Sequence, residues 1–148
     1  MLITIYYIII LRRIQMLTLS KDMEIGVVKI DNQHKELVNR LNAVSAMGSK
    51  SISREETQKT INLLSDYVVK HFYDEELLQR QSGYPKYDWH KEQHNQFIND
   101  FQQLRNEFLK NGSSAKFTLT LSNSVIDWVV RHIKFADAEF GMHYNRTH

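Results

Sequence analysis

Three pairs of side chains in this sequence combine residue types that bind metal ions, and the members of each pair lie about one helical turn apart. The donors are His71 with Glu75, His90 with His94, His132 with Asp137, and the single upstream His34. Imidazole combined with carboxylate suits iron, zinc, copper or nickel. Seven donors are more than one ion can use, so the sequence predicts a site for two metal ions.

Composition narrows the class of protein. The 148 residues suit one domain with a proper core, and the hydrophobic content of 42% and charged content of 24% are typical of a globular protein. The net charge of +2 comes from interspersed charges without a basic block, so nucleic-acid binding is not indicated. Because the chain has no cysteine, it has no disulfides, iron–sulfur clusters or thiolate zinc sites, and this fits a cytoplasmic location.

The first fifteen residues differ from the rest. An apolar run, residues 2–11, is followed by Arg12 and Arg13. The run is too short to span a bilayer, and its charges follow the apolar stretch rather than precede it as in a secretory signal. We interpret residues 1–15 as an extension outside the native domain, with translation starting at Met16 and the domain covering residues 16–148. A short membrane-surface or self-association arm is the alternative.

Three clusters of helix-breaking residues divide the domain: Gly48-Ser49-Lys50-Ser51, Ser82-Gly83-Tyr84-Pro85 and Asn111-Gly112-Ser113-Ser114. The segments between them have the length and composition of helices. Asp31 is a candidate N-cap for the first, and Ser53 with Glu56 forms a capping box for the second. Apolar and polar residues alternate briefly over residues 117–121, as in a β-strand, but the helical periodicity of this segment overrides that signal. The sequence therefore predicts an all-α protein.

Each predicted helix carries apolar residues at the three- and four-residue spacing of helix bundles. The four stripes are His34, Leu37, Leu41 and Val44; Ile61, Leu64, Val68, His71, Glu75 and Leu78; His90, His94, Phe97, Phe101, Leu104 and Phe108; and Leu121, Val125, Trp128 and His132. The candidate ligands occupy positions that normally belong to core residues. Polar groups there are costly unless they are paired or coordinated, which favours a metal site.

Topology provides a second test, because short loops make neighbouring helices antiparallel. The donors lie near the start of the first and third helices and toward the end of the second and fourth. In an up-down-up-down bundle these four places share one end, so the donors can converge. Asp137 lies five residues after His132, off the stripe of an ideal helix. It can reach the site only if the helix ends or bulges near Phe135–Ala136.

These residues and spacings resemble the hemerythrin family, from about Asp22 to Phe140. The matching segments are IGVVKIDNQHKEL around His34, HFYDEE from His71, GYPKYDWHKEQH ending at His94, and WVVRHIKFAD ending at Asp137. Single-domain bacterial hemerythrins are the most similar type. Two departures are Gln79, where many relatives carry Met, and an N-terminal arm (residues 17–24) without the aromatic residue common in bacterial members.

The resemblance implies two iron ions bridged by carboxylates and by an oxo or hydroxo group. By that resemblance, His90, His94 and His132 bind one iron, and His34 and His71 bind the other. Two carboxylates, Glu75 and Asp137, bridge the two irons. The iron with two histidines keeps an open position for dioxygen. Residues one turn from the ligands are candidates for an apolar oxygen pocket, with simple core packing as the alternative: Leu37, Phe72, Trp128 and Val129.

The remaining polar and aromatic candidates are interpreted as structural. Glu76 is expected to be a solvated neighbour of Glu75, and His143 and His148 are expected to be exposed in a tail beyond Gly141. Asp31 is a cap that could also hydrogen-bond His34. Three aromatic residues are expected to pack around the second loop: Tyr84, Tyr87 and Trp89.

The leading hypothesis is a non-enzymatic protein that binds dioxygen reversibly for carriage, storage or delivery, with an unidentified protein partner for delivery. One alternative is a module that senses oxygen, nitric oxide or redox state. Others are a di-iron oxidase or peroxidase, an iron-handling protein and a zinc hydrolase. The hydrolase is disfavoured because HExxH is missing. The two ExxH motifs of ferritin-like oxidases are missing as well.

Overall fold

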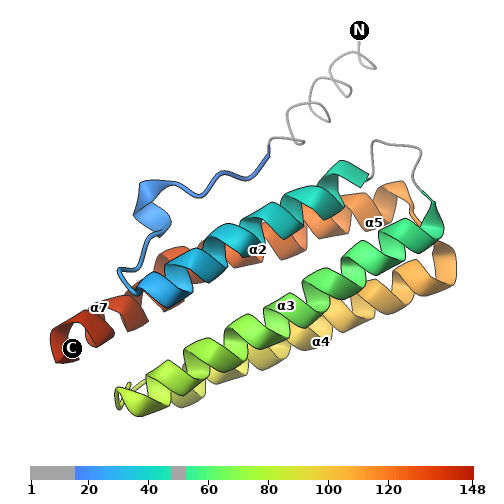
Figure 1. The fold of residues 1–148 in the computed structure, drawn as a ribbon. Helices are drawn as coiled ribbons and strands as arrows, with labels where there is room; N and C mark the ends of the chain where they lie inside the picture. The colour runs from blue at the N-terminus through green and yellow to red at the C-terminus, as the bar shows by residue number, and fades with distance from the viewer. Residues whose placement is uncertain (1–15, 48–52) are drawn as a thin grey trace, which may run out of the picture.

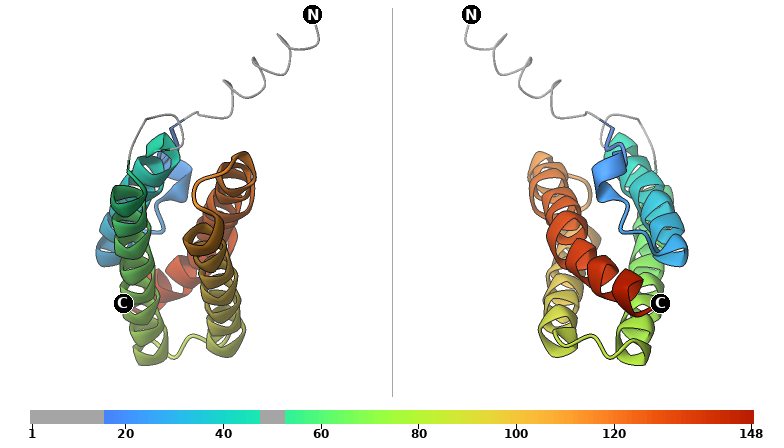
Figure 2. Two further views of the ribbon diagram at one scale, coloured as in Figure 1. Left: turned by 90° about the vertical axis from the view of Figure 1, so that its right-hand side faces the viewer. Right: turned by 90° about the vertical axis from the view of Figure 1, so that its left-hand side faces the viewer.

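The computed structural model describes residues 16–47 and 53–148, and every regular element in these ranges is helical (Figure 1). The elements are η1 (Lys21–Met23), α2 (Val28–Met47), α3 (Arg54–Gln81), α4 (Tyr87–Asn111), α5 (Ala115–Thr120), η2 (Leu121–Ile126), α6 (Asp127–His132), η3 (Ile133–Asp137) and α7 (Ala138–Thr147). The segments from α5 to α7 follow one another as the fourth long helix. Figure 2 shows α2, α3, α4 and this last helix packed side by side, and their order along the chain confirms the predicted up-down-up-down bundle.

The helix ends follow the local chemistry of the sequence. The predicted capping box is confirmed: the Glu56 amide donates to Ser53 Oγ (3.2 Å) and the Ser53 amide donates to Glu56 Oε2 (3.3 Å). Gly83 (φ 63°) and Gly112 (φ 72°) follow the ends of α3 and α4 in the left-handed region that glycine adopts without strain. The predicted break at 48–51 lies outside the described residues.

The prediction that Asp31 caps the first helix is wrong. Helix α2 begins three residues earlier, at Val28. The Asp31 carboxylate instead accepts hydrogen bonds from the backbone N–H groups of Ile25 (2.8 Å) and Gly26 (3.1 Å) in the segment that leads into the helix. Asp31 therefore fixes the angle at which the arm meets α2.

The predicted stripes form the centre of the bundle. Leu41, Leu64 and Phe108 each lose almost all of their accessible surface there. One member differs from the prediction, because Leu78 is only half-buried and its neighbour Gln79 is completely buried. Gln79 lies four residues after Glu75 and so continues the inward stripe, whereas Leu78 lies at its edge.

The fourth helix contains two π-helical segments, and the second one, η3, decides where Asp137 points. A π-helix closes each turn with an i→i+5 hydrogen bond, one residue longer than an α-helix. Asp137, five residues after His132, is thereby returned to the inward face and is completely buried. The helix then continues as α7 to Thr147, beyond the end of the other helices (Figure 1).

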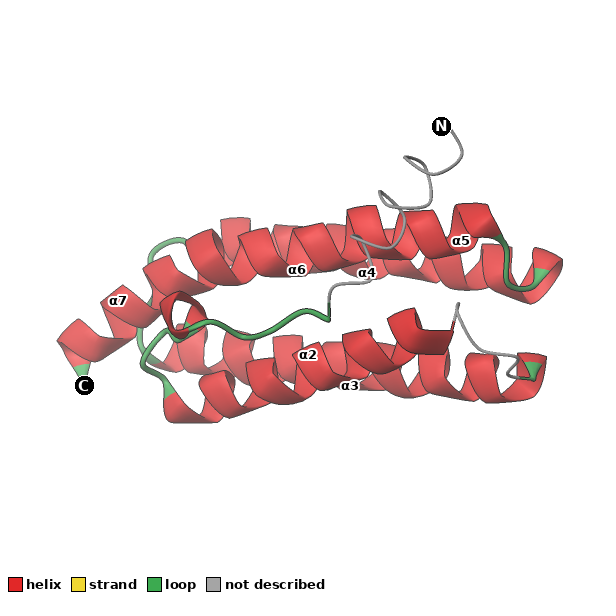
Figure 3. Cartoon of the chain, turned by 90° about the horizontal axis from the view of Figure 1, so that it is seen from above, coloured by secondary structure: helices red, strands yellow, loops and turns green. Residues whose placement is uncertain are grey.

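The prediction that both histidines after Gly141 are exposed is wrong for His143 and confirmed for His148. Helix α7 packs against the N-terminal arm. Phe140 is fully buried in a small apolar cluster with Ile25 and Tyr84. His143 is half-buried, and its Nε2 lies 2.8 Å from the carbonyl oxygen of Ser82. The arm runs along the bundle between α2 and the fourth helix (Figure 3). Residues 1–15 lie outside the described residues.

Gly141→Ala is expected to destabilise the fold strongly. A Cβ atom at this position would lie 2.3 Å from the carbonyl oxygen of Ile25 and 2.8 Å from its Cβ, and backbone atoms cannot move aside as a flexible side chain can. We expect the free energy of unfolding to fall by about 3 kcal/mol, at the upper end for overpacking. Urea denaturation measures this. The exposed neighbouring variant Met142→Ala is the control and should change stability by less than about 0.5 kcal/mol; equal stability of both variants would contradict the packing described here.

None of the helices in the described ranges is long and apolar enough to cross a membrane.

Candidate metal centre

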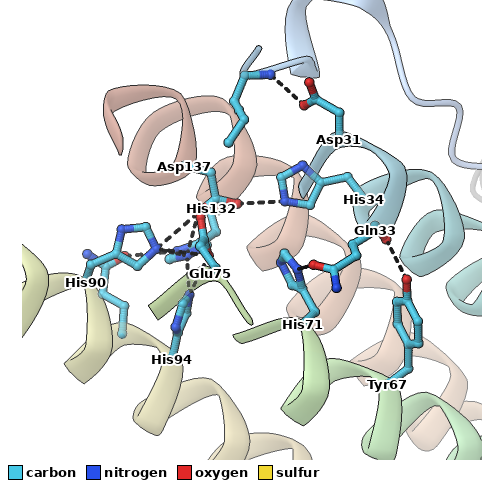
Figure 4. Close-up of polar contacts among 12 residues, drawn as sticks. Asp31, Gln33, His34, Tyr67, His71, Glu75, His90, His94, His132 and Asp137 are labelled. Carbon is cyan, nitrogen blue, oxygen red and sulfur yellow. Dashed lines mark hydrogen bonds and ion pairs between the residues drawn. The ribbon is translucent and has the colours of Figure 1, made fainter. Parts of the chain in front are cut away.

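The structure brings all seven predicted donors together, as Figure 4 shows. They lie toward the end of the bundle where α2 and α4 begin. Helix α2 contributes one donor near its start, α3 contributes two toward its end, and α4 contributes two near its start. In this order they are His34, His71 and Glu75, and His90 and His94. The last two come from the end of α6 and from η3. All seven side chains are buried, with exposed fractions of 0–1% for six of them and 5% for His132.

A first group of five donors surrounds a point between α3, α4 and the fourth helix. Its members are Glu75, His90, His94, His132 and Asp137, whose donor atoms all lie within 4.8 Å of one another. His132 Nε2 lies 3.0 Å from His90 Nε2 and 3.1 Å from His94 Nε2. Asp137 Oδ1 is 3.0 Å from His132 Nε2 and 3.1 Å from His90 Nε2. Three ring nitrogens and two carboxylates thus face one small volume.

A second group lies beside the first and shares one member with it. It consists of His34, His71 and Asp137. Asp137 Oδ2 lies 3.1 Å from His34 Nε2, and the rings of His34 and His71 are 4.9 Å apart. The two oxygens of Asp137 therefore face different groups. Glu75 approaches only the first group, through Oε2 at 3.3 Å from His94 Nε2, so its role as a second bridge stays a prediction.

The buried polar atoms of this cluster are the test of whether metal ions fit. Both carboxylate oxygens of Glu75 and of Asp137 and both ring nitrogens of His34 are buried and form no hydrogen bond of regular geometry in the described structure, and their closest polar contacts are the ion pairs within the cluster. Such groups are costly to bury unless something compensates them. The Nε2 atom of His132 also lies about 3 Å from two other imidazole nitrogens, which repel it if all three carry lone pairs. Cations between the donors satisfy both requirements, so the residues present fit two metal ions.

Burial and ion pairs move the histidine pKa values in opposite directions. Burial lowers the pKa of His71 to about 4, since the nearby carboxylates of Glu75 and Asp137 only partly offset it, and His71 is therefore neutral at pH 7. Burial also disfavours the charged form of His90, but the ion pairs with Asp137 (3.1 Å) and Glu75 (3.5 Å) outweigh it and raise its pKa to about 10. Without metal, His90 carries a proton on the nitrogen that faces the site.

Metal loading at pH 7 is therefore expected to release protons, and metal affinity should increase with pH up to about 10, where His90 loses its proton in the metal-free chain. Titration calorimetry in two buffers with different heats of ionisation measures the release. The buffer takes up the released protons, so the apparent enthalpy should be more negative in the buffer with the larger heat of ionisation, by an amount that scales with the difference between the two heats. Identical heats in the two buffers would show that no proton leaves.

Three side chains hold the outward ring nitrogens of three histidines. Gln33 Oε1 lies 3.1 Å from His71 Nδ1, and Glu76 Oε1 lies 3.0 Å from His94 Nδ1. The third contact joins Gln93 Oε1 to Nδ1 of His132, at 3.2 Å. Such contacts fix the tautomer and orientation of metal-binding imidazoles. The prediction that Glu76 is a solvated neighbour is wrong, because the antiparallel packing of α3 and α4 directs it to His94.

Sequence reasoning missed Gln33 and Gln93 entirely. Each lies immediately before a candidate ligand in the sequence but contacts a histidine of the next helix, as Glu76 also does. Adjacency to a ligand is the signal that could have found them, together with the antiparallel order of the helices. The possible bond from Asp31 to His34 is not formed, because both carboxylate oxygens bind backbone N–H groups.

Two of the four residues predicted to line an oxygen pocket, Phe72 and Trp128, contact donor rings, and the role of all four stays a prediction. Phe72 stacks on the His94 ring (3.8 Å between centroids, 5° between planes), and Trp128 stacks on His132 (4.3 Å, 12°). Leu37 and Val129 are buried in the main core, whereas Trp128 is half-buried. Trp128 also lines a surface pocket of about 310 Å³ beside His132.

The aromatic residues of the second loop differ in burial. Tyr84 is buried, with its ring 6.3 Å from that of His90, as expected for packing around the loop. Tyr87 is half-buried, and Trp89 is 52% exposed. His148 is exposed and stacks on Tyr144. Neither His148 nor His143 belongs to a donor group in the described residues.

Comparison with known proteins is consistent with this geometry. The family model described as "Hemerythrin HHE cation binding domain" matches residues 25–143. The chain is 32% identical over 114 residues to a bacteriohemerythrin of Methylococcus capsulatus, covering 75% of this chain and 82% of that protein. A bacteriohemerythrin of Stenotrophomonas maltophilia is 28% identical over 125 residues (84% and 79%). A crystal structure of wild-type hemerythrin superposes with a TM-score of 0.76 at 26% identity, covering 88% of this chain and 98% of that one.

Proposed function

This chain belongs to the hemerythrin family, and from that premise we propose that it binds dioxygen reversibly, without catalysing a reaction, at a centre of two iron ions. We propose a role in carrying, storing or delivering oxygen in the cytoplasm, where a chain without cysteine is at no disadvantage. The family model and the buried donor groups support a cation-binding function. The oxygen chemistry is the part that the proposal adds.

The proposed assignment gives each ion its own donors. His90, His94 and His132 would hold one ion, His34 and His71 would hold the other, and two carboxylates would bridge them: Glu75 and Asp137. When bound, the two irons supply the electrons that dioxygen takes up on binding and returns on release. The protein side chains hold the ions at fixed positions, and the outward contacts of their imidazoles keep the rings from turning.

The single observation that carries the proposal is the unequal number of donors in the two groups. Five donors surround the first position, and only three surround the second. A saturated ion has no place for an external ligand, whereas a position with fewer protein donors keeps one. The asymmetry therefore favours binding of a small ligand beside His34 and His71, the second group.

Apolar residues around the donors exclude water from the site. Phe72 lies next to His71 in α3 and covers His94, while Leu37 is one turn from His34 and buried. Val129 is buried one turn before His132 in the last helix. A dry surrounding limits proton entry and so favours release of the ligand unchanged over irreversible oxidation of the site.

A single optical experiment tests the proposal. The iron-loaded full-length chain is reduced without oxygen, exposed to air, and then returned to an oxygen-free atmosphere. A visible charge-transfer band that appears in air and disappears when oxygen is removed is the expected result. Irreversible bleaching with release of hydrogen peroxide would indicate an oxidase instead, and binding of one zinc ion per chain without any response to oxygen would indicate a hydrolase; either would overturn the proposal.

A further inference from the structure

A continuous series of contacts joins a donor of the metal centre to two lysines at the protein surface. Gln33 Oε1 lies 3.1 Å from His71 Nδ1, and Gln33 Nε2 donates to Asp74 Oδ2 at 2.6 Å. Asp74 in turn forms ion pairs with Lys70 (2.7 Å) and Lys29 (3.0 Å). Gln33 and His71 face each other between α2 and α3, as Figure 4 shows.

The chemistry of Asp74 decides which way the Gln33 amide points. An ionised carboxylate only accepts hydrogen bonds, and the two lysine ammonium groups keep Asp74 ionised. The group of Gln33 that faces Asp74 must therefore be its NH₂, which leaves its carbonyl oxygen to face His71. An oxygen acceptor at 3.1 Å requires that His71 Nδ1 carry the hydrogen. The Nε2 lone pair of the neutral ring is then free for a metal ion.

The burial of the series makes this orientation effective. Gln33 is 8% exposed, and the Asp74 side chain is 13% exposed, so water competes little for the contacts between them. The lysine side chains are more than half exposed and connect the series to solvent. A contact between a buried amide and a carboxylate is strong because one partner is charged.

Among the other histidine donors, only His94 has a comparable series, in which Glu76 contacts its Nδ1 directly at 3.0 Å and lies 4.0 Å from Lys91. Gln93 approaches His132 Nδ1 at 3.2 Å, but among the described residues no carboxylate contacts its amide nitrogen. The Nδ1 atoms of His34 and His90 are buried without a partner in the described structure. Of the two histidines in the second donor group, only His71 is therefore fixed through its outward nitrogen.

We propose that Asp74 and Gln33 are positioning residues, which lock His71 in the tautomer that presents Nε2 to the metal ion and thereby set the metal affinity of the second donor group. The inference rests on the proposed role of His71 as a ligand. It predicts that the ion pairs of Asp74 with Lys29 and Lys70 influence the second donor group, which is the metal position with room for an external ligand. A change three residues from His71 in sequence would thus alter the site without touching a donor.

The test compares Asp74→Asn with the double variant Asp74→Asn/Gln33→Glu. In the single variant the new amide can donate or accept, so the Gln33 amide is free to turn round. In the double variant the new carboxylate at position 33 only accepts, so it can bond His71 Nδ1–H and the new amide at position 74 together. Orientation is therefore lost in the first variant and restored in the second. Glu36→Gln, which breaks the exposed i,i+4 pair with Arg40 on the same helix, is the matched control.

Two quantities are measured on the full-length chain loaded with zinc(II), a diamagnetic probe. The first is the solvent-exchange rate of the His71 Nδ1–H proton by ¹⁵N NMR, and the second is zinc affinity at each position. We expect a protected Nδ1–H in the wild type, and in Asp74→Asn faster exchange with roughly 10- to 100-fold weaker zinc binding at the second position only. The double variant and Glu36→Gln should resemble the wild type.

The inference is overturned if wild-type His71 shows no protected Nδ1–H, if Asp74→Asn exchanges and binds zinc like the wild type, or if the double variant is no better than the single one. Neither measurement involves oxygen. A normal pattern of exchange and zinc affinity in a chain that fails the optical test would therefore reject the oxygen function while the positioning role of Asp74 and Gln33 stands.

Discussion

Asp137→Asn is expected to remove both metal ions from the protein together. The side chain is the one member of both donor groups, with Oδ1 toward His90 and His132 and Oδ2 toward His34. The amide has nearly the same shape, so the packing is retained, but the charge that holds two cations side by side is lost. We expect the affinity at both positions to fall by more than the roughly 100-fold that the loss of an outer partner costs.

Iron content per chain after gel filtration, determined by mass spectrometry, measures this effect. The control is Asp127→Asn, an exposed aspartate in the same long helix that belongs to neither donor group. The control should keep the iron content of the wild type. Loss of one ion with full retention of the other in Asp137→Asn would show that Asp137 is not shared.

His71→Ala is expected to have a different result, the loss of one ion and of the entire oxygen response. The second group has only three donors, and removal of His71 leaves His34 and a shared carboxylate, too few to hold an ion tightly. The three-histidine group is unchanged and should keep its ion. The visible band that depends on oxygen should be absent.

The iron content and the optical response are measured on the same sample. His143→Ala, a histidine near the bundle end outside both groups, is the matched control and should leave both quantities unchanged. Retention of the oxygen band in His71→Ala would show that the ligand enters elsewhere. Loss of both ions would show that the two positions cannot be occupied separately.

The bundle fold and the position of the donors along its axis were predictable, because they depend on helical periodicity and on loop length. His34, His71, His90 and His132 lie on apolar stripes, and antiparallel packing places them at one end whatever the details of side-chain geometry. Local rules performed well where one interaction decides the outcome, as in the capping box of Ser53.

One feature was predicted only as a condition for the site, and two were not predictable because they depend on contacts between segments. The π-helical segment that brings Asp137 inward was required by the hypothesis, yet no residue of the Ile133–Asp137 segment indicates it by type. Asp31 is of a residue type that favours the N-cap position, but its carboxylate binds the arm, because the arm supplies two backbone N–H groups before the helix begins. The packing of α7 at Gly141 depends on the close approach of the Ile25 backbone, which is distant in sequence.

The partners of the outward histidine nitrogens show the same limit. Gln33, Glu76 and Gln93 are polar residues next to a ligand, a position that sequence alone assigns to solvent. Each contacts the following helix because adjacent helices are antiparallel and the ligands lie at equal depth. The register of the helices, to within one residue, determines which of them can reach a ring nitrogen.

Anomalous diffraction at the iron absorption edge, from crystals of the iron-loaded full-length chain, tests the central claim most directly. The account predicts two separate iron peaks, one contacted by His90, His94 and His132 and the other by His34 and His71, with Asp137 contacting both. A single peak, or an iron whose nearest side chains lie outside these residues, would contradict it.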